Sequence, residues 1–129
     1  MKIALVTDTH FGARNDHDHF NNYFYEFYDN IFFPYLKEHN IDTCIHLGDV
    51  MDRRKFVSYK TAKDFREKFC ETFVTNDINV HMIVGNHDTY FKNTNEVNSL
   101  DELIGSRYEN IKIYRETETV DFDIPICFI

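Results

Sequence analysis

The sequence contains no hydrophobic run close to the roughly 20 apolar residues that a membrane-spanning helix requires. Its N-terminal segment, MKIALVTDTH, reaches Asp8 too soon for a secretory signal peptide. These two absences exclude an integral membrane protein and argue against a secreted one. We therefore expect a cytoplasmic protein with no membrane partner.

Cysteine is also scarce. The chain has only Cys44, Cys70 and Cys127, an odd number of residues that lie far apart in apolar surroundings. A disulfide framework or a zinc knuckle needs paired or closely spaced cysteines. We predict that all three are buried free thiols.

Basic residues are too few for a protein that coats nucleic acid. The 14 Lys and Arg are outnumbered by 22 Asp and Glu, which gives a formal net charge of -8, whereas counterion release from a nucleic acid requires clustered cations. The rest of the composition is globular, since 43% of the 129 residues are hydrophobic and 13 Phe and 8 Tyr supply large core side chains. This length and composition predict one folded domain rather than a disordered chain.

Hydrophobic periodicity predicts that strands and helices alternate along the chain. Three apolar runs of strand length occupy residues 2–7, 42–47 and 80–84. Three further strands are expected in succession at residues 110–114, 119–122 and 124–129. Apolar residues at helical spacing occupy residues 18–39, 58–76 and 99–104. The resulting order, β-α-β-α-β-α-β-β-β, predicts an α/β fold with a mainly parallel sheet flanked by helices.

Local signals predict where some of the helices bend or end. Pro34 is expected to bend or terminate the first long helix. Ser99 and Glu102, three residues apart, have the pattern of a capping box, and Gly105 is expected to end that short helix.

A cluster of polar residues follows each of the first three strands. The clusters are Asp8-Thr9-His10, Gly48-Asp49-Val50-Met51-Asp52-Arg53 and Gly85-Asn86-His87-Asp88. Parallel strands bring their carboxyl ends to one edge of the sheet, which is where α/β folds bind ligands. We expect side chains from all three clusters to converge there: Asp8, His10, Asp49, Asn86 and His87.

The residue types in these clusters predict a metal site. Carboxylate, imidazole and amide ligands together suit Mn, Fe or Zn better than an all-oxygen Mg or Ca site. Asp49 lies between two ligand groups and could bridge two ions, and a pair of divalent ions suits phosphate-ester hydrolysis. A single Asp-x-His would be weak support, but three such clusters on successive strand ends favour the metal site.

The motifs DTH, GDVMDR and GNHD resemble the first three motifs of the calcineurin-like metallophosphoesterases. Including the RRK, GNHDTYFKN and TVDFD segments, the chain also resembles the SbcD-type DNA repair nucleases, among them the recombination endonuclease subunits of T-even-like bacteriophages. The resemblance implies that residues 1–129 are the N-terminal part of a metallophosphoesterase sandwich. It implies a nuclease for DNA recombination and repair that uses two divalent ions, with Mn as the first choice and Mg, Fe or Zn as alternatives.

The same resemblance implies a role for each matching residue. Asp8 and His10 would bind the first metal, Asp49 would bridge, and Asn86 would bind the second. His87 would stabilise the scissile phosphate or protonate the leaving oxygen. The residues implied to orient these groups are Asp52, Arg53 and Asp88. The implied partners are DNA, an SbcC-type coiled-coil ATPase and a second copy of the chain in a homodimer.

One departure from the family pattern concerns histidine. The family completes its two-metal site with histidines from Gly-His and Gly-His-x-His motifs, but this chain has none in the 42 residues after His87. We therefore expect these 129 residues to be incomplete at the C-terminus and to carry half a site, with weak metal binding and no useful turnover.

Half of the basic residues lie in one segment, from Arg53 to Lys68, which has a net charge of +5 while the rest of the chain carries -13. Arg54, Lys55 and Lys60 are candidates for contacts with the DNA backbone. A solvated helix face with ion pairs between neighbouring turns is an equal alternative.

Two further features lie near the first long helix. Residues 20–35 contain nine aromatic side chains, most of which we expect in the core, with the remainder on the surface or at a contact. The preceding Asp16-His17-Asp18-His19 could be a metal-binding tract, but we favour helix capping because acidic residues are common at helix N-termini.

Two alternatives to a nuclease remain open. The same fold could serve a phosphatase or a small-nucleotide phosphodiesterase, which activity on a phosphomonoester would distinguish from a nuclease. The chain could also be a non-catalytic module that kept the motif loops.

Overall fold

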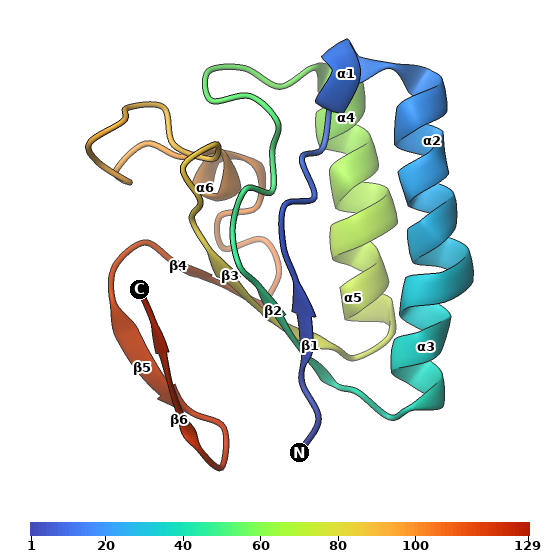
Figure 1. Cartoon of the computed structure of the whole chain (residues 1–129), viewed down its shortest axis with the longest axis vertical. Coiled ribbons are helices and arrows are strands. Elements are labelled where there is room, and N and C mark those ends of the chain that lie inside the picture. Colours follow the sequence, from blue (N-terminus) through green and yellow to red (C-terminus); the bar gives the residue numbers. More distant parts are fainter.

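Four parallel strands, paired in chain order, form the centre of the computed structural model, which describes residues 1–129 (Figure 1). The strands are β1 (Ala4–Val6), β2 (Thr43–His46), β3 (Asn79–Ile83) and β4 (Ile111–Tyr114). Each lies within an apolar run expected to be a strand or extends one residue beyond it. The α/β fold with a parallel sheet flanked by helices is therefore confirmed.

Two long helical segments cover the sheet, and each contains a wider π-helical turn. The first consists of α2 (Asp18–Phe27), η1 (Tyr28–Phe32) and α3 (Phe33–Glu38), after a short turn α1 (Ala13–Asp16). The second consists of α4 (Tyr59–Asp64), η2 (Phe65–Cys70) and α5 (Glu71–Thr75). None of the helices is both long and apolar enough to cross a bilayer.

Pro34 does not end the first helix, which continues to Glu38. Proline lacks an N–H group and cannot donate to the helical ladder. The backbone N–H of Phe33 instead bonds five residues back to the Tyr28 carbonyl, and this wider turn places Pro34 at the start of α3, where a missing donor costs little.

Helix α6 (Ser99–Leu103) begins one residue earlier than its capping pattern indicated. Asn98 is the N-cap, and its Oδ1 accepts a hydrogen bond from the backbone N–H of Asp101 at 2.8 Å. The capping-box prediction for Ser99 is therefore wrong, because Asn98 has the extended backbone that a cap requires. Gly105 follows the helix in the left-handed conformation, with φ of 54°, as expected.

The two faces of the sheet pack against different layers. In β3, Val80 and Met82 point into the main core beneath the helices, whereas His81 and Ile83 point to the other face. Strands in sequential order with right-handed crossovers place the connecting helices on the same face. The main core accordingly collects apolar side chains from both long helical segments and from α6.

The second face is covered by the antiparallel hairpin of β5 (Glu118–Asp121) and β6 (Pro125–Phe128). Phe128 stacks on Tyr114 with ring centroids 4.1 Å apart, and both are buried together with Ile45. The molecule thus has three layers, helices, parallel sheet and hairpin, and the carboxyl ends of β1, β2 and β3 remain outside them (Figure 1).

The cysteine prediction is confirmed in part. All three cysteines are free, and Cys44 and Cys70 are buried. Cys127 is exposed, contrary to expectation, because side chains alternate along β6 and only one face of the hairpin packs on the sheet.

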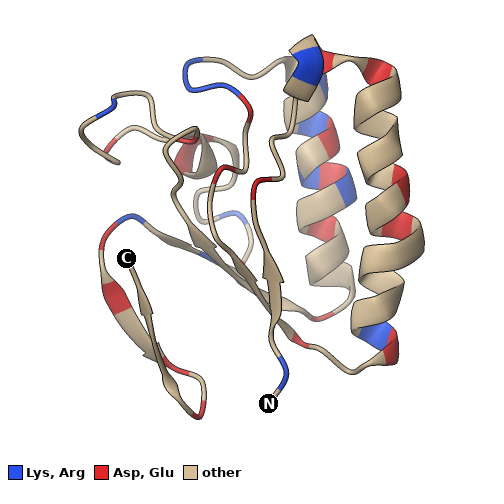
Figure 2. Ribbon diagram, viewed as in Figure 1, with Lys and Arg blue, Asp and Glu red and all other residues tan.

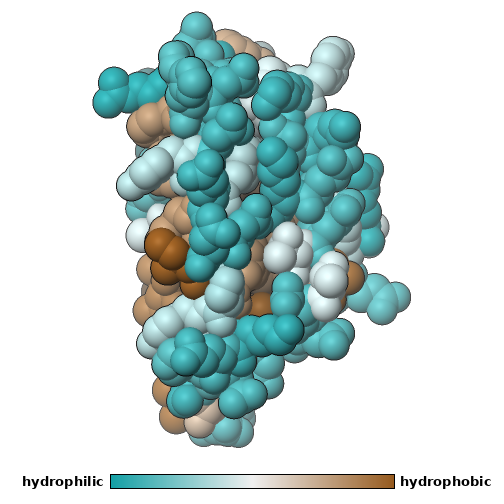
Figure 3. Space-filling view, turned by 90° about the vertical axis from the view of Figure 1, so that its right-hand side faces the viewer, coloured by the Kyte–Doolittle hydropathy of each residue, from teal (hydrophilic) through white to brown (hydrophobic).

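The aromatic side chains of the first helix are divided between core and surface. Tyr25, Tyr28 and Phe33 are buried, Phe20 and Phe32 are half-buried, and the other four are exposed. More of them therefore reach the surface than expected. Seen from the helix side, apolar patches show between the hydrophilic side chains (Figure 3).

Candidate metal centre

The loop after β1 carries Asp8 and His10. It continues the pairing of β1 with β2, because the N–H groups of Asp8 and His10 donate to the carbonyls of Gly48 and Asp49 at 3.2 and 3.1 Å. Thr7 donates its hydroxyl hydrogen to Asp8 Oδ2 at 2.5 Å, and this bond holds the pKa of the Asp8 carboxyl below its ordinary value. Asp8 is thus an anion that already faces the end of the sheet.

The loops after β2 and β3 approach so closely that both need glycine. A Cβ atom on Gly85 would lie 2.1 Å from the backbone nitrogen of Asp49, and one on Gly48 would lie 2.8 Å from the Cα of Gly85. No side chain fits at either position. The contact fixes Asp49 against the loop that carries Asn86 and His87.

Three of the expected ligands have a left-handed backbone. The φ angles are 53° for Asp8, 43° for His10 and 53° for Asp49. Non-glycine residues are uncommon in this region, and such strain gathers at functional sites. Three of the five residues that the motifs select therefore have a strained backbone, although left-handed residues also occur in turns elsewhere, such as Asn40 and Asp77.

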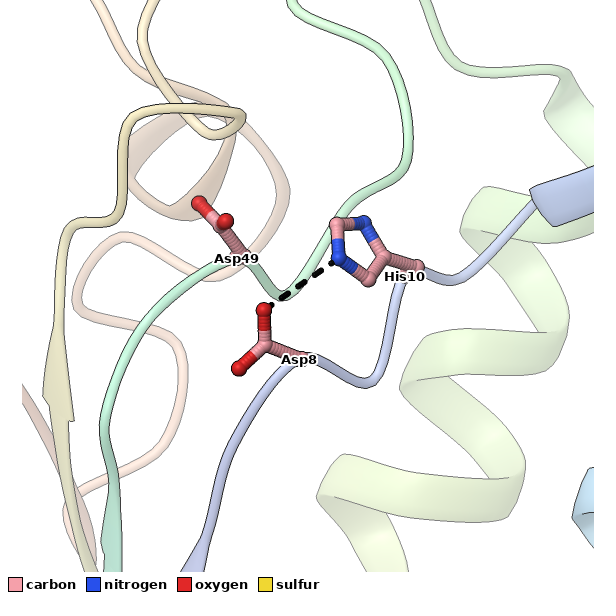
Figure 4. A group of neighbouring side chains, drawn as sticks. All are labelled: Asp8, His10 and Asp49. Atoms are coloured by element: carbon pink, nitrogen blue, oxygen red, sulfur yellow. Dashed lines mark ion pairs between the residues drawn. The ribbon is translucent and has the colours of Figure 1, made fainter.

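The side chains of Asp8 and His10 face each other, and that of Asp49 lies beside them on the neighbouring loop (Figure 4). Each offers a ligand atom, and these atoms all lie within 4.8 Å of one another. His10 Nε2 is 3.4 Å from Asp8 Oδ1, whereas its buried Nδ1 has no hydrogen-bond partner and lies 3.7 Å from Asp52 Oδ1. The expected convergence is therefore present for these three residues.

Asn86 and His87 join the cluster through Asp49. The backbone N–H of His87 donates to Asp49 Oδ1 at 2.9 Å. The side-chain amide of Asn86 lies 3.1 and 3.2 Å from the two carboxylate oxygens of Asp49. Without a cation between them the amide nitrogen donates to Asp49, whereas with a cation the amide oxygen can turn inward as a ligand.

His87 has one nitrogen engaged and one free. Its Nδ1 lies 2.8 Å from the backbone carbonyl of Asp52. A carbonyl only accepts, so Nδ1 carries the hydrogen and Nε2 is left for another partner. The ring meets that of His10 edge to face, with centroids 5.0 Å apart. The free nitrogen is therefore available next to the ligand cluster.

Asp88 is fully buried and joins the loops after β2 and β3. Its two oxygens accept backbone N–H groups from Val50 at 3.2 Å, Met51 at 2.8 Å and Gly85 at 2.9 Å. Burial raises the pKa of this carboxyl, and the three N–H groups oppose the rise. Asp88 thus contacts the backbone that carries Asp49 rather than the cluster itself.

His46 was not among the expected site residues, yet it links the loops that carry Asp8, His10 and Asp49. The N–H of Gly48 donates to its Nδ1 at 3.2 Å, so its Nε2 carries the hydrogen and donates to Thr9 Oγ1 at 3.0 Å. Thr9 in turn donates to the Val50 carbonyl. Burial lowers the pKa of His46 to about 4 and keeps it neutral. The only signal in the sequence was a polar residue inside an apolar strand.

Asp52 and Arg53 lie at the edge of the cluster. Asp52 approaches His10 with its side chain and His87 with its carbonyl. Arg53 donates to Asn15 Oδ1, lies 3.9 Å from Asp16 and stacks over Phe56. Arg53 therefore tethers the left-handed turn at residues 14–16 rather than contacting a ligand.

The stretch Asp16-His17-Asp18-His19 does not cap α2. His17 is at the N-cap position but forms no side-chain cap hydrogen bond. Asp16 instead accepts a hydrogen bond from the Thr61 hydroxyl of α4. A side-chain cap is therefore absent and Asp16 joins the two helical segments, but Asp18 lies in the first turn of α2, where an acidic residue is expected.

Most of the basic segment is engaged in ion pairs, as Figure 2 illustrates by the alternating colours along α4 and η2. Lys60 lies 2.8 Å from Asp64 and 3.5 Å from Asp18, and the pairs Lys63–Glu67 and Lys68–Asp64 measure 3.9 and 3.8 Å. Lys60 therefore belongs to a solvated helix face with ion pairs, the alternative to DNA contact. Arg54 and Lys55 form no ion pair; Lys55 lies over the ring of Tyr90.

The donor set fits a divalent cation. It combines carboxylate, imidazole and amide groups, a set that suits Mn, Fe or Zn. His10 Nε2 faces Asp8 Oδ1 at 3.4 Å, and Asn86 lies where its oxygen could share a cation with Asp49. Both observations are accounted for by a cation in this cluster.

Comparison with known proteins gave two findings. The family model described as calcineurin-like phosphoesterase matches residues 1–126. A curated protein named "Exonuclease subunit 1", from Enterobacteria phage T4, is 35% identical over 123 residues, which cover 95% of this chain and 35% of that protein. The chain thus spans about a third of the length of this relative.

Proposed function

The chain belongs to the calcineurin-like phosphoesterase family, and from that premise we propose that it is the ligand-bearing N-terminal part of a metal-dependent nuclease that hydrolyses DNA phosphodiesters. The observation that carries the proposal is the convergence of Asp8, His10 and Asp49 in strained backbone at the end of a parallel sheet. The phage T4 relative, named as an exonuclease subunit, supports DNA as the substrate.

In this proposal Asp8 and His10 would hold one divalent cation, Asn86 would hold a second, and Asp49 would contribute to both. When bound, such ions supply Lewis-acid stabilisation of a phosphate and lower the pKa of water. His87, with Nδ1 fixed on the Asp52 carbonyl, directs Nε2 toward the phosphate or the leaving oxygen. Asp88 and His46 act as positioning residues that hold the three loops together.

Finer features of the proposal rest on the family resemblance alone. These are manganese as the metal, a role in DNA recombination and repair, and a homodimer with an SbcC-type coiled-coil ATPase. Within the chain, Arg54 and Lys55 support a DNA substrate, because both are cations without an ion pair on the loop that follows Asp49 and Asp52.

Titration calorimetry with Mn²⁺ tests the metal site. We expect weak binding by the unmodified chain, since the Gly-His ligands of the family are not among these residues. Asp49→Asn should lower the affinity at least about tenfold, because even groups that only orient ligands cost ~10–100-fold when removed. Asp121→Asn, on the exposed strand β5, is the matched control and should bind Mn²⁺ normally. Equal affinity in all three proteins would contradict the site.

The reaction itself is tested with two substrates in the same Mn²⁺ buffer, a labelled linear duplex and a chromogenic phosphomonoester. We expect any turnover to be on DNA and to disappear in Asp49→Asn. Turnover of the phosphomonoester alone would instead favour a phosphatase of the same fold.

A further inference from the structure

A small cavity of about 240 Å³ is lined in part by residues that follow the candidate metal ligands on their loops. Residues from the loop after β2, the loop after β3 and the start of α6 line it. It is smaller than the ~300–1,000 Å³ typical of sites for free small molecules. The size therefore suits one projecting group of a larger ligand.

Two polar atoms at this cavity are buried without a hydrogen-bond partner. They are Nη1 of Arg54 and Oγ of Ser99, and both residues line the cavity. Buried polar groups are nearly always bonded, so each unpaired one calls for an explanation. A guanidinium and a hydroxyl on residues that line one cavity are donors suited to a phosphate. One acidic residue, Glu102, also lines it, so we expect the anion at the Arg54 guanidinium.

Two exposed aromatic rings flank these donors. The side chain of Phe56 is 62% exposed and that of Tyr90 is 41% exposed, although both line the cavity. Each ring has a cation against it, Arg53 at 4.9 Å from the Phe56 centroid and Lys55 at 5.4 Å from that of Tyr90. Aromatic faces among cations are the features by which proteins bind single-stranded nucleic acid.

The cavity shares its loops with the metal centre. Phe56 follows Asp52 by four residues, and Tyr90 follows His87 by three. The contact between Lys55 and Tyr90 joins the two loops. A strand bound in the cavity would therefore pass close to the candidate ligands.

We propose that this cavity binds an unpaired nucleotide of a DNA strand, with the phosphate at Arg54 and Ser99 and the base against Phe56 or Tyr90. The inference deepens the proposed nuclease function and rests on it. It adds to that function a single-stranded segment in the bound DNA next to the bond to be cut.

Fluorescence anisotropy with a labelled oligo(dT) and a blunt duplex of equal length tests the proposal, in EDTA so that no cleavage occurs. Phe56→Leu and Tyr90→Leu remove the aromatic faces but keep apolar side chains. Each should weaken oligo(dT) binding about 5- to 100-fold, the loss expected for one base–aromatic stack, and should leave duplex binding nearly unchanged. Arg54→Gln should weaken oligo(dT) binding as well.

The matched controls are Tyr23→Leu, an exposed aromatic on α2 away from the cavity, and Lys63→Gln, an exposed cation on α4. Both should bind oligo(dT) like the unmodified chain. The proposal is overturned if Phe56→Leu and Tyr90→Leu bind oligo(dT) normally, or if they lose duplex affinity equally. Inorganic phosphate or thymidine monophosphate competing as well as oligo(dT) would assign the cavity to a free nucleotide and would also overturn it.

The result is separable from that of the nuclease proposal. Oligo(dT) binding that depends on Phe56 and Tyr90 in a chain without Asp49-dependent hydrolysis would retain the nucleotide site and reject the nuclease. Hydrolysis that requires Asp49 but is indifferent to both rings would do the reverse.

Discussion

Asp8, His10 and Asp49 all have left-handed backbone, which costs each of them roughly 1–2 kcal/mol. The cost is sustained because hydrogen bonds and close backbone contacts fix all three loops. The loop after β1 bonds to that after β2, and Asp88 and the glycine contact join the loops after β2 and β3. Contacts between the loops therefore fix the backbone of Asp8, His10 and Asp49 in the conformation that brings their side chains together.

His46 should make stability depend on pH. Its pKa is about 4 in the folded protein and about 6.5 when unfolded. Between these values the unfolded chain takes up a proton that the folded protein excludes, so stability falls as the pH is lowered from 6.5 to 4. The loss is about 1.4 kcal/mol per pH unit and on the order of 3 kcal/mol in total.

His46→Gln removes this titration and should flatten the dependence by about one proton over that range. Its stability near pH 7 should be lower by about 1–3 kcal/mol, because the bonds to Gly48 and Thr9 are disturbed. Urea denaturation of both proteins at half-unit intervals from pH 4 to 7 measures the difference. Parallel curves would show that His46 does not exclude the proton.

The sequence predicts the residues of the ligand cluster better than it predicts the residues that position them. Asp8, His10 and Asp49 could be found because motifs at successive strand ends must meet at one edge of a parallel sheet. His46 could not, since its partner Thr9 is 37 residues away and no spacing rule pairs them. The contacts of Arg53 with Asn15 and Asp16 could not be predicted either, because these partners lie in a turn without a sequence signal.

At the scale of elements, the two long helical segments begin differently. Ser58 caps α4, and its Oγ accepts the N–H of Thr61 at 3.1 Å. His17 has the extended backbone of a cap at the start of α2 but provides no side-chain bond. A substitution can therefore remove the side-chain cap of α4 or add one to α2.

Single substitutions at these two caps should change stability in opposite directions. Ser58→Ala should lower the free energy of unfolding by about 1 kcal/mol, because an N–H group of the first turn loses its acceptor. His17→Ser should raise it by about 0.5–1 kcal/mol, since serine can accept from that turn. Urea denaturation at pH 7 measures both, and the double mutant should be close to neutral because the sites are independent. A decrease in both single variants would contradict the assigned caps.

The elements themselves were predictable because apolar periodicity reports which face is buried. The ends of the helices and strands were harder to predict from the sequence. The spacing of Ser99 and Glu102 indicates a capping box at Ser99, but the extended backbone that a cap requires is at Asn98. The π-helical turn that accommodates Pro34 and the exposure of Cys127 both depend on tertiary packing that no local pattern contains.

At the scale of the whole molecule, charge is unevenly distributed. The net charge is -8, although Arg53 to Lys68 form a positive segment. Within it, Lys60, Lys63 and Lys68 are paired with acidic neighbours, and these pairs are exposed and individually weak. The cations without such neighbours include Arg54 and Lys55, which lie on the side of the candidate metal centre rather than on the helix.

This division predicts which cations set the salt dependence of DNA binding. Each cation that neutralises a phosphate contributes about 0.7–0.9 to the slope of log affinity against log salt concentration, because it displaces a counterion. Arg54→Gln and Lys55→Gln should therefore each reduce the slope by about that amount. Lys60→Gln should change it little, because Asp18 and Asp64 already neutralise that lysine. Anisotropy titrations from 25 to 200 mM salt, with ~25 mM steps, resolve a change of this size over a roughly tenfold range of concentration. If Lys60→Gln reduced the slope as much as Arg54→Gln, the whole basic segment would contact DNA and its ion pairs would open on binding.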